Sequence, residues 1–330
     1  MTVPAADSRV CFACGALLPA PAIRAIDRWQ GTPGTFGVAR CELCGAGRTY
    51  PRMDDTDLGR LYGDEYAPYT RVRGLLAIVS LLIRRSQTAR ALRSVPYAAL
   101  RGLRPGRGLD VGAGRGDLSD ALQRRGWRMT AIEPSADATH IGRDLGLDAR
   151  TGTLATVTLE QDAYEIAIFQ QSLEHANEPV AELRHARTAL RPGGLVLVSV
   201  PNFGSAQARW FRGAWFHLDL PRHRVHFTRA ALVRSLERAG FVPESTATTS
   251  SSVGLAASIQ YALAGRCLFP AGMAFRVAAL AAMLLAPVGA LLDKATGGGD
   301  ILHAVGRRPD DRPGPAAHHP APVTVQTSDR

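Results

Sequence analysis

The sequence predicts an α/β protein built around a mostly parallel sheet, and three observations support this prediction. Residues 108–118 have the pattern of a short apolar strand, a glycine-rich turn and the start of a helix. A further strand over 127–132 ends in an acidic residue, Glu133. Apolar runs at 164–169 and 195–200 alternate with segments of helical character, as they do in βαβ units. This order of elements is typical of a Rossmann-like sheet.

Four of the five cysteines form two C-x-x-C pairs near the N-terminus. The pairs are Cys11 with Cys14 and Cys41 with Cys44; 26 residues separate them, and a glycine follows each pair. Two thiolates at this spacing reach the same tetrahedral ion, and four sulfur ligands close the coordination shell of Zn²⁺. We therefore predict a zinc-ribbon-like module with a structural zinc ion. A closed shell leaves no position for substrate or water.

The glycine turn favours a cofactor that carries positive charge. Three glycines spaced two residues apart let the backbone pass close to a ligand, and Asp110 ends the preceding strand. Glu133, about twenty residues further on, is placed to accept both hydroxyls of a ribose. The nicotinamide fingerprint needs glycine at position 117, where the sequence has Asp117. An acidic side chain there repels a pyrophosphate and favours a cofactor with an ammonium and a sulfonium.

Several motifs in a fixed order make the sequence similar to the class I S-adenosylmethionine (SAM)-dependent methyltransferases. The motifs are the glycine turn 109–116, the acidic run 133–135, the post-strand segment 173–175, the turn 190–194 and the segment 220–228. More narrowly, the chain resembles a bacterial branch of small-molecule methyltransferases that often carries an N-terminal C-x-x-C pair module. The resemblance implies a seven-stranded sheet whose last strand is antiparallel.

We expect four segments along the chain. They are a zinc-ribbon-like module at 1–60, a helical linker at 61–104, a methyltransferase domain at 105–306 and a disordered tail at 307–330. An amphipathic pattern over 71–100 predicts the helix of the linker. An apolar helical insertion at 253–295 precedes the last strand of the methyltransferase domain.

The resemblance also implies which residues bind the cofactor. Asp110 and the glycine turn would face the methionine part, and Glu133 the ribose. Relatives often carry an acidic residue for the adenine at the position of 151–154, so backbone groups near Gly152 and Thr153 are expected to supply that contact here. The predicted cofactor-binding residues are Asp110, Gly112, Ala113, Gly114, Gly116, Glu133, Pro134, Gly152, Thr153 and Gln171.

Two histidines are the predicted catalytic residues. Methyl transfer is an in-line displacement, so the protein positions the partners and supplies a base for a hydroxyl or an acidic carbon. Histidine suits this role because its unperturbed pKa is about 6.5. We predict His223 as the base and His175 as a second catalytic residue; the alternatives are a structural hydrogen bond for His223 and a helix start for His175. Glu174 next to His175 also suggests metal-assisted O-methylation, although no further carboxylate stands nearby at ligand spacing.

The apolar insertion predicts a contact surface and not a membrane span. Its longest uncharged stretch, 277–292, has 16 residues, and a helix of that length spans about 24 Å, less than the roughly 30 Å of a hydrocarbon core. We expect a helical pair that covers the active-site mouth or forms a homodimer surface, or an interfacial anchor with peripheral membrane contact. The cysteine pattern and the polar segment 1–9 indicate the cytoplasm, with membrane association as an alternative.

Charge gives weak evidence for a nucleic-acid partner. The formal net charge is +10, but the cations are almost all arginines spread along the chain, and Lys294 is the sole lysine. No run combines clustered arginines with the interleaved aromatic residues that stack on bases.

From these motifs together, we predict methyl transfer from SAM to an oxygen or carbon of a small molecule. The alternatives are an RNA methyltransferase that docks through the zinc module, and a SAM-binding protein without catalysis.

Overall fold

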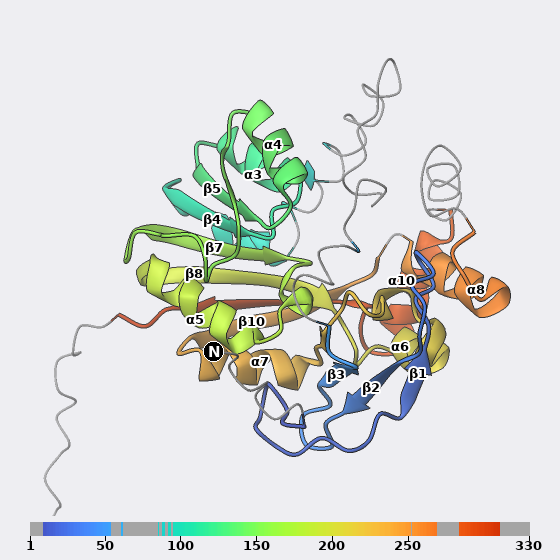
Figure 1. Ribbon diagram of the computed structural model, residues 1–330. Coiled ribbons are helices and arrows are strands. Elements are labelled where there is room, and N and C mark those ends of the chain that lie inside the picture. The colour runs from blue at the N-terminus through green and yellow to red at the C-terminus, as the bar shows by residue number, and fades with distance from the viewer. Residues whose placement is uncertain are drawn as a thin grey trace, which may run out of the picture.

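A computed structural model (Figure 1) describes residues 9–53, 95–251, 253–268 and 284–310, together with Leu61, Arg85, Thr88, Ala89, Leu92 and Arg93. Most of the helix predicted over 71–100 and the tail beyond residue 310 lie outside the described residues. The next continuous described stretch begins at residue 95, and within it Tyr97–Leu100 form a short 3-10 turn, η1.

Seven strands form one mixed sheet in the order β10-β11-β8-β7-β4-β5-β6. The strands are β4 (Arg107–Val111), β5 (Arg128–Glu133), β6 (Asp148–Thr151), β7 (Tyr164–Gln170), β8 (Leu190–Pro201), β10 (Val242–Thr249) and β11 (Ile301–Arg307). The pairs among β4, β5, β6, β7 and β8 are parallel, whereas β11 is antiparallel to both β8 and β10. The predicted Rossmann-like sheet with an antiparallel last strand is confirmed.

Helices pack on both faces of this sheet because alternate strand residues point to opposite sides. On β7, Ala167 and Phe169 belong to one buried cluster with α5 and α7, while Ile166 and Ile168 belong to another with α3 and η1. The helices of these clusters are α3 (Asp117–Gln123), α5 (Pro179–Ala189) and α7 (Arg229–Arg238), and α4 (Ala136–Asp144) contacts β5 and β6. The glycine turn and the segment after β7 therefore lie at the carboxyl ends of buried parallel strands.

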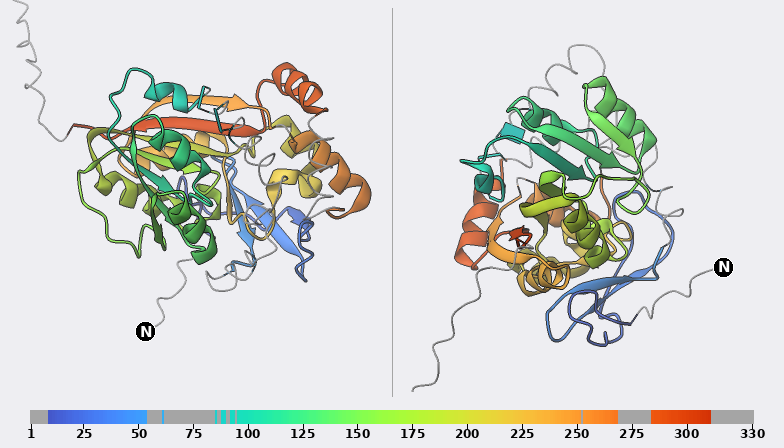
Figure 2. Two further views of the ribbon diagram at one scale, coloured as in Figure 1. Left: turned by 90° about the horizontal axis from the view of Figure 1, so that it is seen from above. Right: turned by 90° about the vertical axis from the view of Figure 1, so that its left-hand side faces the viewer.

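The N-terminal cysteine segment forms a second sheet that the rest of the chain completes. Its own strands are β1 (Ile23–Ala25), β2 (Phe36–Arg40) and β3 (Gly47–Tyr50), and β9 (Val225–His226) adds a fourth strand from far along the sequence. The rings of Phe12 and Phe227 meet edge to face with centroids 5.1 Å apart. Both parts contribute to one buried cluster. Figures 1 and 2 show this module on the far side of the molecule from α3 and α4.

The predicted apolar helical insertion before the last strand is confirmed. It includes α8 (Gly254–Ala264) and α10 (Ala286–Ala295), which follow β10 and precede β11. These helices contact each other and the short helix α6 (Ala206–Phe211) is packed on α8, at the end of the molecule seen on the right of Figure 1. Leucines 263, 284 and 291 are 84%, 80% and 68% exposed. In the described part of the chain, no helix combines the length and apolarity needed to cross a membrane.

Two local predictions are wrong. His175 does not begin a helix: Leu173–His175 form a 3-10 turn, η2, and α5 begins at Pro179, a residue suited to a first helical position. Residues 190–194 are not a simple turn but the start of β8. This part of β8 contains a bulge: Leu190 pairs with Tyr164 and Leu195 pairs with Ile166, so β8 advances five residues while β7 advances two.

Candidate active site and metal-ligand cluster

The glycine turn after β4 packs closely against Ser172 and the end of β5. Gly112 and Gly116 have φ of 70° and 82°, and a Cβ at Gly112 would lie 2.5 Å from the Cβ of Ser172. The amides of Gly112 and Ala113 donate to the Ile132 carbonyl at 2.8 and 3.1 Å. The hydroxyl of Ser172 donates to the carbonyl that ends β4, at 2.6 Å. The segment after β7 is therefore fixed directly against this turn.

The carboxylate of Glu133, which ends β5, faces the same turn. Its Oε2 accepts a hydrogen bond from the amide of Gly114 at 2.8 Å, and its Oε1 accepts one from the amide of Ser135 at 3.0 Å. The amide of Gly152 donates to the Glu133 carbonyl at 3.0 Å. The structure thus gathers eight of the predicted cofactor residues at the ends of β4, β5 and β6: Gly112, Ala113, Gly114, Gly116, Glu133, Pro134, Gly152 and Thr153. Their contacts with a cofactor stay predictions.

Asp110 differs from these residues because its carboxylate points into the domain. It is 1% exposed and accepts a hydrogen bond from the hydroxyl of Ser119 in α3 at 2.7 Å. Burial raises the pKa of Asp110 to about 6, and the nearby carboxylate of Glu133 acts in the same direction. In this structure the side chain joins β4 to α3, and its role as a cofactor ligand stays a prediction.

Tyr97 is a residue of this region that the sequence patterns did not single out. It is buried, and its hydroxyl donates to Oε1 of Gln170 at 2.5 Å. The next residue, the predicted cofactor ligand Gln171, has a positive φ of 52° and donates its amide to the Ser199 carbonyl at 2.8 Å. Tyr97 was missed because it lies in a segment whose pattern indicated a linker helix.

Glu174, His175 and His223 form a compact cluster beyond Ser172. Their ligand atoms lie within 4.8 Å of one another, and the centroids of the two imidazole rings are 4.8 Å apart. Nδ1 of His175 lies 3.0 Å from the Arg222 carbonyl, and Nδ1 of His223 lies 2.9 Å from the His217 carbonyl. Because a carbonyl oxygen only accepts, each Nδ1 carries a proton and each Nε2 of the neutral rings presents a lone pair. The two predicted catalytic histidines therefore meet.

Burial controls the protonation of this cluster. Glu174 is 1% exposed, and its carboxylate oxygens have no hydrogen-bond partner among the described residues. Burial raises the pKa of Glu174 to about 8. Burial likewise lowers the pKa of His223 well below its ordinary value and lowers the pKa of His175. Near neutral pH the cluster thus holds a largely protonated carboxyl group and two neutral imidazoles.

The other two histidines of this region have structural partners. Nε2 of His217 lies 3.0 Å from Oδ2 of Asp300, a carboxylate that is fully buried. Nε2 of His226 lies 3.0 Å from the hydroxyl of Thr49, and burial lowers the pKa of His226 to about 3. His223 and His175 are therefore better placed than these two to exchange a proton with a ligand.

The four predicted metal ligands, Cys11, Cys14, Cys41 and Cys44, converge on one point. The Sγ atoms of Cys11 and Cys44 are 3.5 Å apart, those of Cys14 and Cys41 are 3.4 Å apart, and all four lie within 4.8 Å of one another. Zinc–sulfur bonds of about 2.3 Å in a tetrahedron place sulfur atoms about 3.8 Å apart. The thiol groups therefore have the number, chemistry and spacing of a tetrahedral zinc site.

The cysteine module also holds the segment that carries His223, here called the histidine loop (residues 219–228). The guanidinium of Arg222, fully buried, donates to both carboxylate oxygens of Asp27 at 2.8 and 3.0 Å. The hydroxyl of Thr49 donates to the His223 carbonyl at 2.7 Å, and the hydroxyl of Thr228 to the Cys44 carbonyl at 2.5 Å. The position of His223 thus depends on contacts from the first fifty residues.

Comparison with known proteins agrees with this geometry. A family model described as a methyltransferase domain matches residues 83–246. A ubiquinone biosynthesis O-methyltransferase of Aeromonas salmonicida is 29% identical over 41% of this chain and 62% of its own length. One from Xanthomonas campestris is 32% identical over 32% of this chain and 48% of its own length. The chain thus spans less than two thirds of these relatives.

Among solved structures, the chain is similar to a SAM-dependent methyltransferase from Archaeoglobus fulgidus. The identity is 16%, the TM-score is 0.47, and the match covers 68% of this chain and 94% of that chain. The family match assigns residues 83–246 to a methyltransferase domain, and the strand order of the sheet is the one that the resemblance to class I SAM-dependent methyltransferases implies.

Proposed function

We propose that the whole chain transfers a methyl group from SAM to an oxygen or carbon atom of a small-molecule acceptor. The observation that carries this proposal is the cluster of Glu174, His175 and His223 next to the glycine turn. The cluster lies close to the residues predicted to hold SAM, and its neutral imidazole nitrogens can accept a proton from the acceptor. A hydroxyl or an acidic carbon needs such a base, whereas a neutral amine does not.

In this mechanism the chain orients the acceptor and handles one proton. When bound, SAM supplies an electrophilic methyl carbon. His223 accepts the acceptor's proton on Nε2, because its Nδ1 is already bonded to a backbone carbonyl. The imidazolium formed is favoured by the carboxylate of Asp219, whose Oδ2 lies 3.9 Å from that nitrogen. The protonated carboxyl group of Glu174 lies at the same distance from it. His175, whose ring meets that of His223 edge to face, contacts the acceptor or shares the proton.

The names of the relatives support a hydroxyl acceptor. The two curated relatives described above are named ubiquinone biosynthesis O-methyltransferases, a name that implies methylation of oxygen. A small-molecule O-methylation is therefore our first proposal, with carbon as the alternative atom. Neither the RNA methyltransferase nor the non-catalytic SAM-binding protein is favoured by these relatives.

We also propose that the four cysteines hold one zinc ion with a structural role. The 1–60 module would then be a rigid support for the histidine loop, because β3, Asp27 and Thr49 all contact that loop. The methyltransferase domain at 105–306 and this module would act as one unit. The exposed leucines of α8 and α10 support a contact surface, with a membrane or a second copy as its partner.

The test is SAM titration followed by turnover on a panel of phenolic, sugar and lipid-like acceptors. We expect SAM to bind and His223→Ala to lower kcat by a factor of 100 or more, since a general base contributes about 10²–10⁴-fold. SAM affinity should not change in this variant. His226→Ala is the matched control, because His226 is also buried in the loop but bonds to Thr49. Equal kcat values for wild type and His223→Ala would remove the base assignment.

A further inference from the structure

The guanidinium group of Arg222 is shared by two carboxylates. Nη1 and Nη2 donate to the two carboxylate oxygens of Asp27 at 3.0 and 2.8 Å. Nε donates to both oxygens of Asp219 at 3.0 and 3.1 Å, and Nη2 donates to Oδ1 of Asp219 at 2.6 Å. Nη1 also donates to Oε1 of Gln30 at 3.1 Å. The five N–H donors of this buried side chain are therefore all engaged, and its orientation is fixed.

One cation between two anions leaves this network with a net charge of −1. The carboxylate of Asp27 also accepts hydrogen bonds from three amides within residues 29–32 and from the hydroxyl of Thr32. Burial raises the pKa of Asp27, but the hydrogen bonds and charge of Arg222 outweigh burial and lower it below its ordinary value. Asp27 is therefore ionised at neutral pH, as is the Asp219 carboxylate that contacts the same guanidinium.

Asp219 presents the excess negative charge to the proposed base. Its Oδ2 lies 3.9 Å from Nε2 of His223, and its carbonyl accepts a hydrogen bond from the His223 amide at 2.9 Å. The backbone of Asp219 has a positive φ of 34°, which is uncommon for a residue other than glycine. Such a conformation costs energy and persists where the surrounding structure holds it. Here the hydrogen bonds from Arg222 hold it.

Asp27 and Asp219 compete for the same cation. Asp27 contacts the Nη1–Nη2 end of the guanidinium with two hydrogen bonds, and Asp219 contacts the Nε–Nη2 side. If Asp27 were neutral, the full charge of Arg222 would lie against Asp219 alone, and these two charges would cancel. The charge that Asp219 presents to His223 therefore depends on a residue 195 positions before Arg222.

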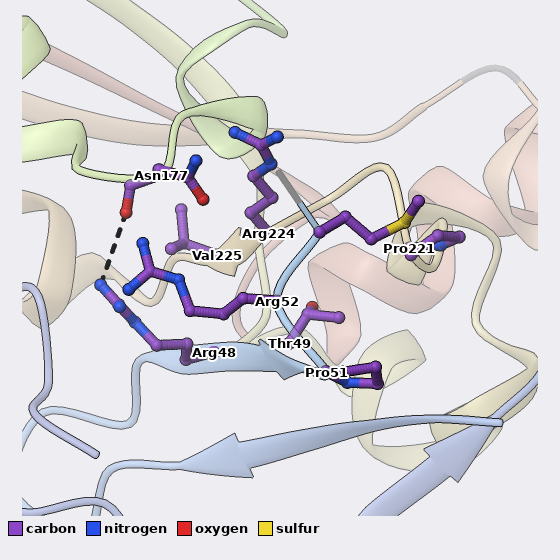
Figure 3. A pocket seen from close by; sticks show the side chains of 9 residues that line it. Arg48, Thr49, Pro51, Arg52, Asn177, Pro221, Arg224 and Val225 are labelled. Atoms are coloured by element: carbon purple, nitrogen blue, oxygen red, sulfur yellow. Dashed lines mark hydrogen bonds between the residues drawn. The ribbon is translucent and has the colours of Figure 1, made fainter. Parts of the chain in front are cut away.

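The histidine loop has little room to move away from the cysteine module. Figure 3 shows Thr49 and Pro51 of the module at the same hollow as Pro221 and Val225 of the loop. The free volume of this hollow is about 10 Å³, which is room for about one water molecule. The loop on which Asp219 and His223 lie is therefore packed against the module that carries Asp27.

The charges of this network act on the catalytic cluster with opposite signs. Burial lowers the pKa of His175, and the guanidinium charges of Arg222 and Arg224 act in the same direction, whereas the carboxylate of Asp219 raises it. After burial, Asp219 also raises the pKa of Glu174. The titratable and charged groups that face His223 or its neighbour His175 are Glu174, His217, Asp219, Arg222, Arg224 and His226.

We propose that Asp27 of the cysteine module is a positioning residue for methyl transfer. It cancels the charge of Arg222 and holds the guanidinium, so that Asp219 keeps a negative charge directed at His223. The inference rests on the proposed role of His223 as the base. It gives the cysteine module an electrostatic part in the reaction in addition to its mechanical support of the loop.

The first experiment measures this charge without turnover. Carbon-13 NMR of the full chain, labelled at the glutamate carboxyl carbon and assigned with Glu174→Gln, follows the titration of Glu174. We expect a midpoint of about 8 in the wild type and a lower one in Asp27→Asn. The decrease should be about one pH unit, as expected for loss of a unit charge about 10 Å away at an effective dielectric constant near 20.

Two further variants complete this titration. Asp219→Asn makes the same change in net charge at a side chain that is 21% exposed, and it should lower the midpoint as well. Asp148→Asn is the matched control, because Asp148 forms a two-pronged ion pair with Arg150 on the exposed side of β6. It should leave the midpoint unchanged. An unchanged midpoint in Asp219→Asn would overturn the inference even where Asp27→Asn does not fold.

The second experiment compares two phenolic acceptors of nearly the same shape, one of them fluorinated so that its hydroxyl is ionised at the assay pH. Asp27→Asn should lower kcat about tenfold for the protonated acceptor and leave kcat unchanged for the ionised one, because an ionised nucleophile needs no base. Asp27→Glu, which keeps the charge, should restore kcat for the protonated acceptor. The affinity for SAM should stay constant in both variants.

Equal midpoints of Glu174 in wild type and Asp27→Asn, or equal losses of kcat for the two acceptors, would overturn the inference. The second result would mean that Asp27 only supports the loop. Absence of SAM binding by the wild type would instead overturn the proposed function, and the titration of Glu174 would still decide whether Asp27 acts on the cluster.

Discussion

Replacing Glu174 by glutamine should make the protein more stable at alkaline pH than the wild type. The folded-state pKa of Glu174 is raised to about 8 by burial, from an ordinary value of 4.5. Between these two pH values the folded state keeps a proton that the unfolded state has lost, so the stability of the wild type falls as pH rises. At about 1.4 kcal/mol for each pH unit, this interval corresponds to at most about 5 kcal/mol. Glutamine has nearly the same shape and no proton to lose.

The assay is urea denaturation of wild type and Glu174→Gln at pH 5, 7 and 8.5. We expect the free energies of unfolding to be closest at pH 5 and the difference to move in favour of the variant by several kcal/mol at pH 8.5. Glu237→Gln, on the exposed surface of α7, should show no such pH dependence. If the difference between wild type and Glu174→Gln is the same at all three pH values, Glu174 is not a buried group with a raised pKa.

Three further substitutions test the supports of the site. Thr49→Val removes the hydroxyl that donates to the His223 carbonyl at 2.7 Å. Because a lost buried hydrogen bond costs about 1–3 kcal/mol, we expect kcat in steady-state assays to fall roughly tenfold while the affinity for SAM stays the same. Cys41→Ser should reduce the metal content from about one zinc per chain and lower the Tm, measured by elemental analysis and calorimetry; an unchanged Tm would argue against a structural ion. Gly112→Ala should abolish SAM binding by calorimetry, because a Cβ there would lie 2.5 Å from another side chain, whereas Gly146→Ala, also at positive φ but with nothing within 4 Å, should bind normally.

The regular parts of the molecule could be predicted because they depend on local patterns. Buried parallel strands appear as apolar runs, and the glycine turn with Glu133 has a fixed spacing, so the Rossmann-like sheet was predicted from these patterns. Its antiparallel last strand was predicted from the resemblance to class I methyltransferases. The C-x-x-C pairs similarly specified which thiols converge. In these cases the residues that define the feature are close in sequence or follow a known order.

The features that could not be predicted depend on contacts between distant segments. The pairing of β3 with β9 joins Arg48 to Val225, and a two-residue strand has no recognisable period. The ion pair of Asp27 with Arg222 gave no signal because each residue alone is an ordinary surface type. The third member of the cluster around Glu174 is a histidine from the loop and not another carboxylate, so a search for nearby carboxylates missed it.

The strand β9 has a consequence for the order in which the chain is completed during synthesis. The sheet of the N-terminal module gains its fourth strand, and Asp27 its guanidinium partner, only when residues 222–226 are available. At about 5–20 residues per second, a ribosome needs roughly 10 to 40 s to extend the chain from Tyr50 to Thr228. During that interval the sheet of the cysteine module is incomplete, because the edge of β3 has no partner strand. The cysteine module, although made before the histidine loop, therefore reaches its final structure only after that loop has been synthesised.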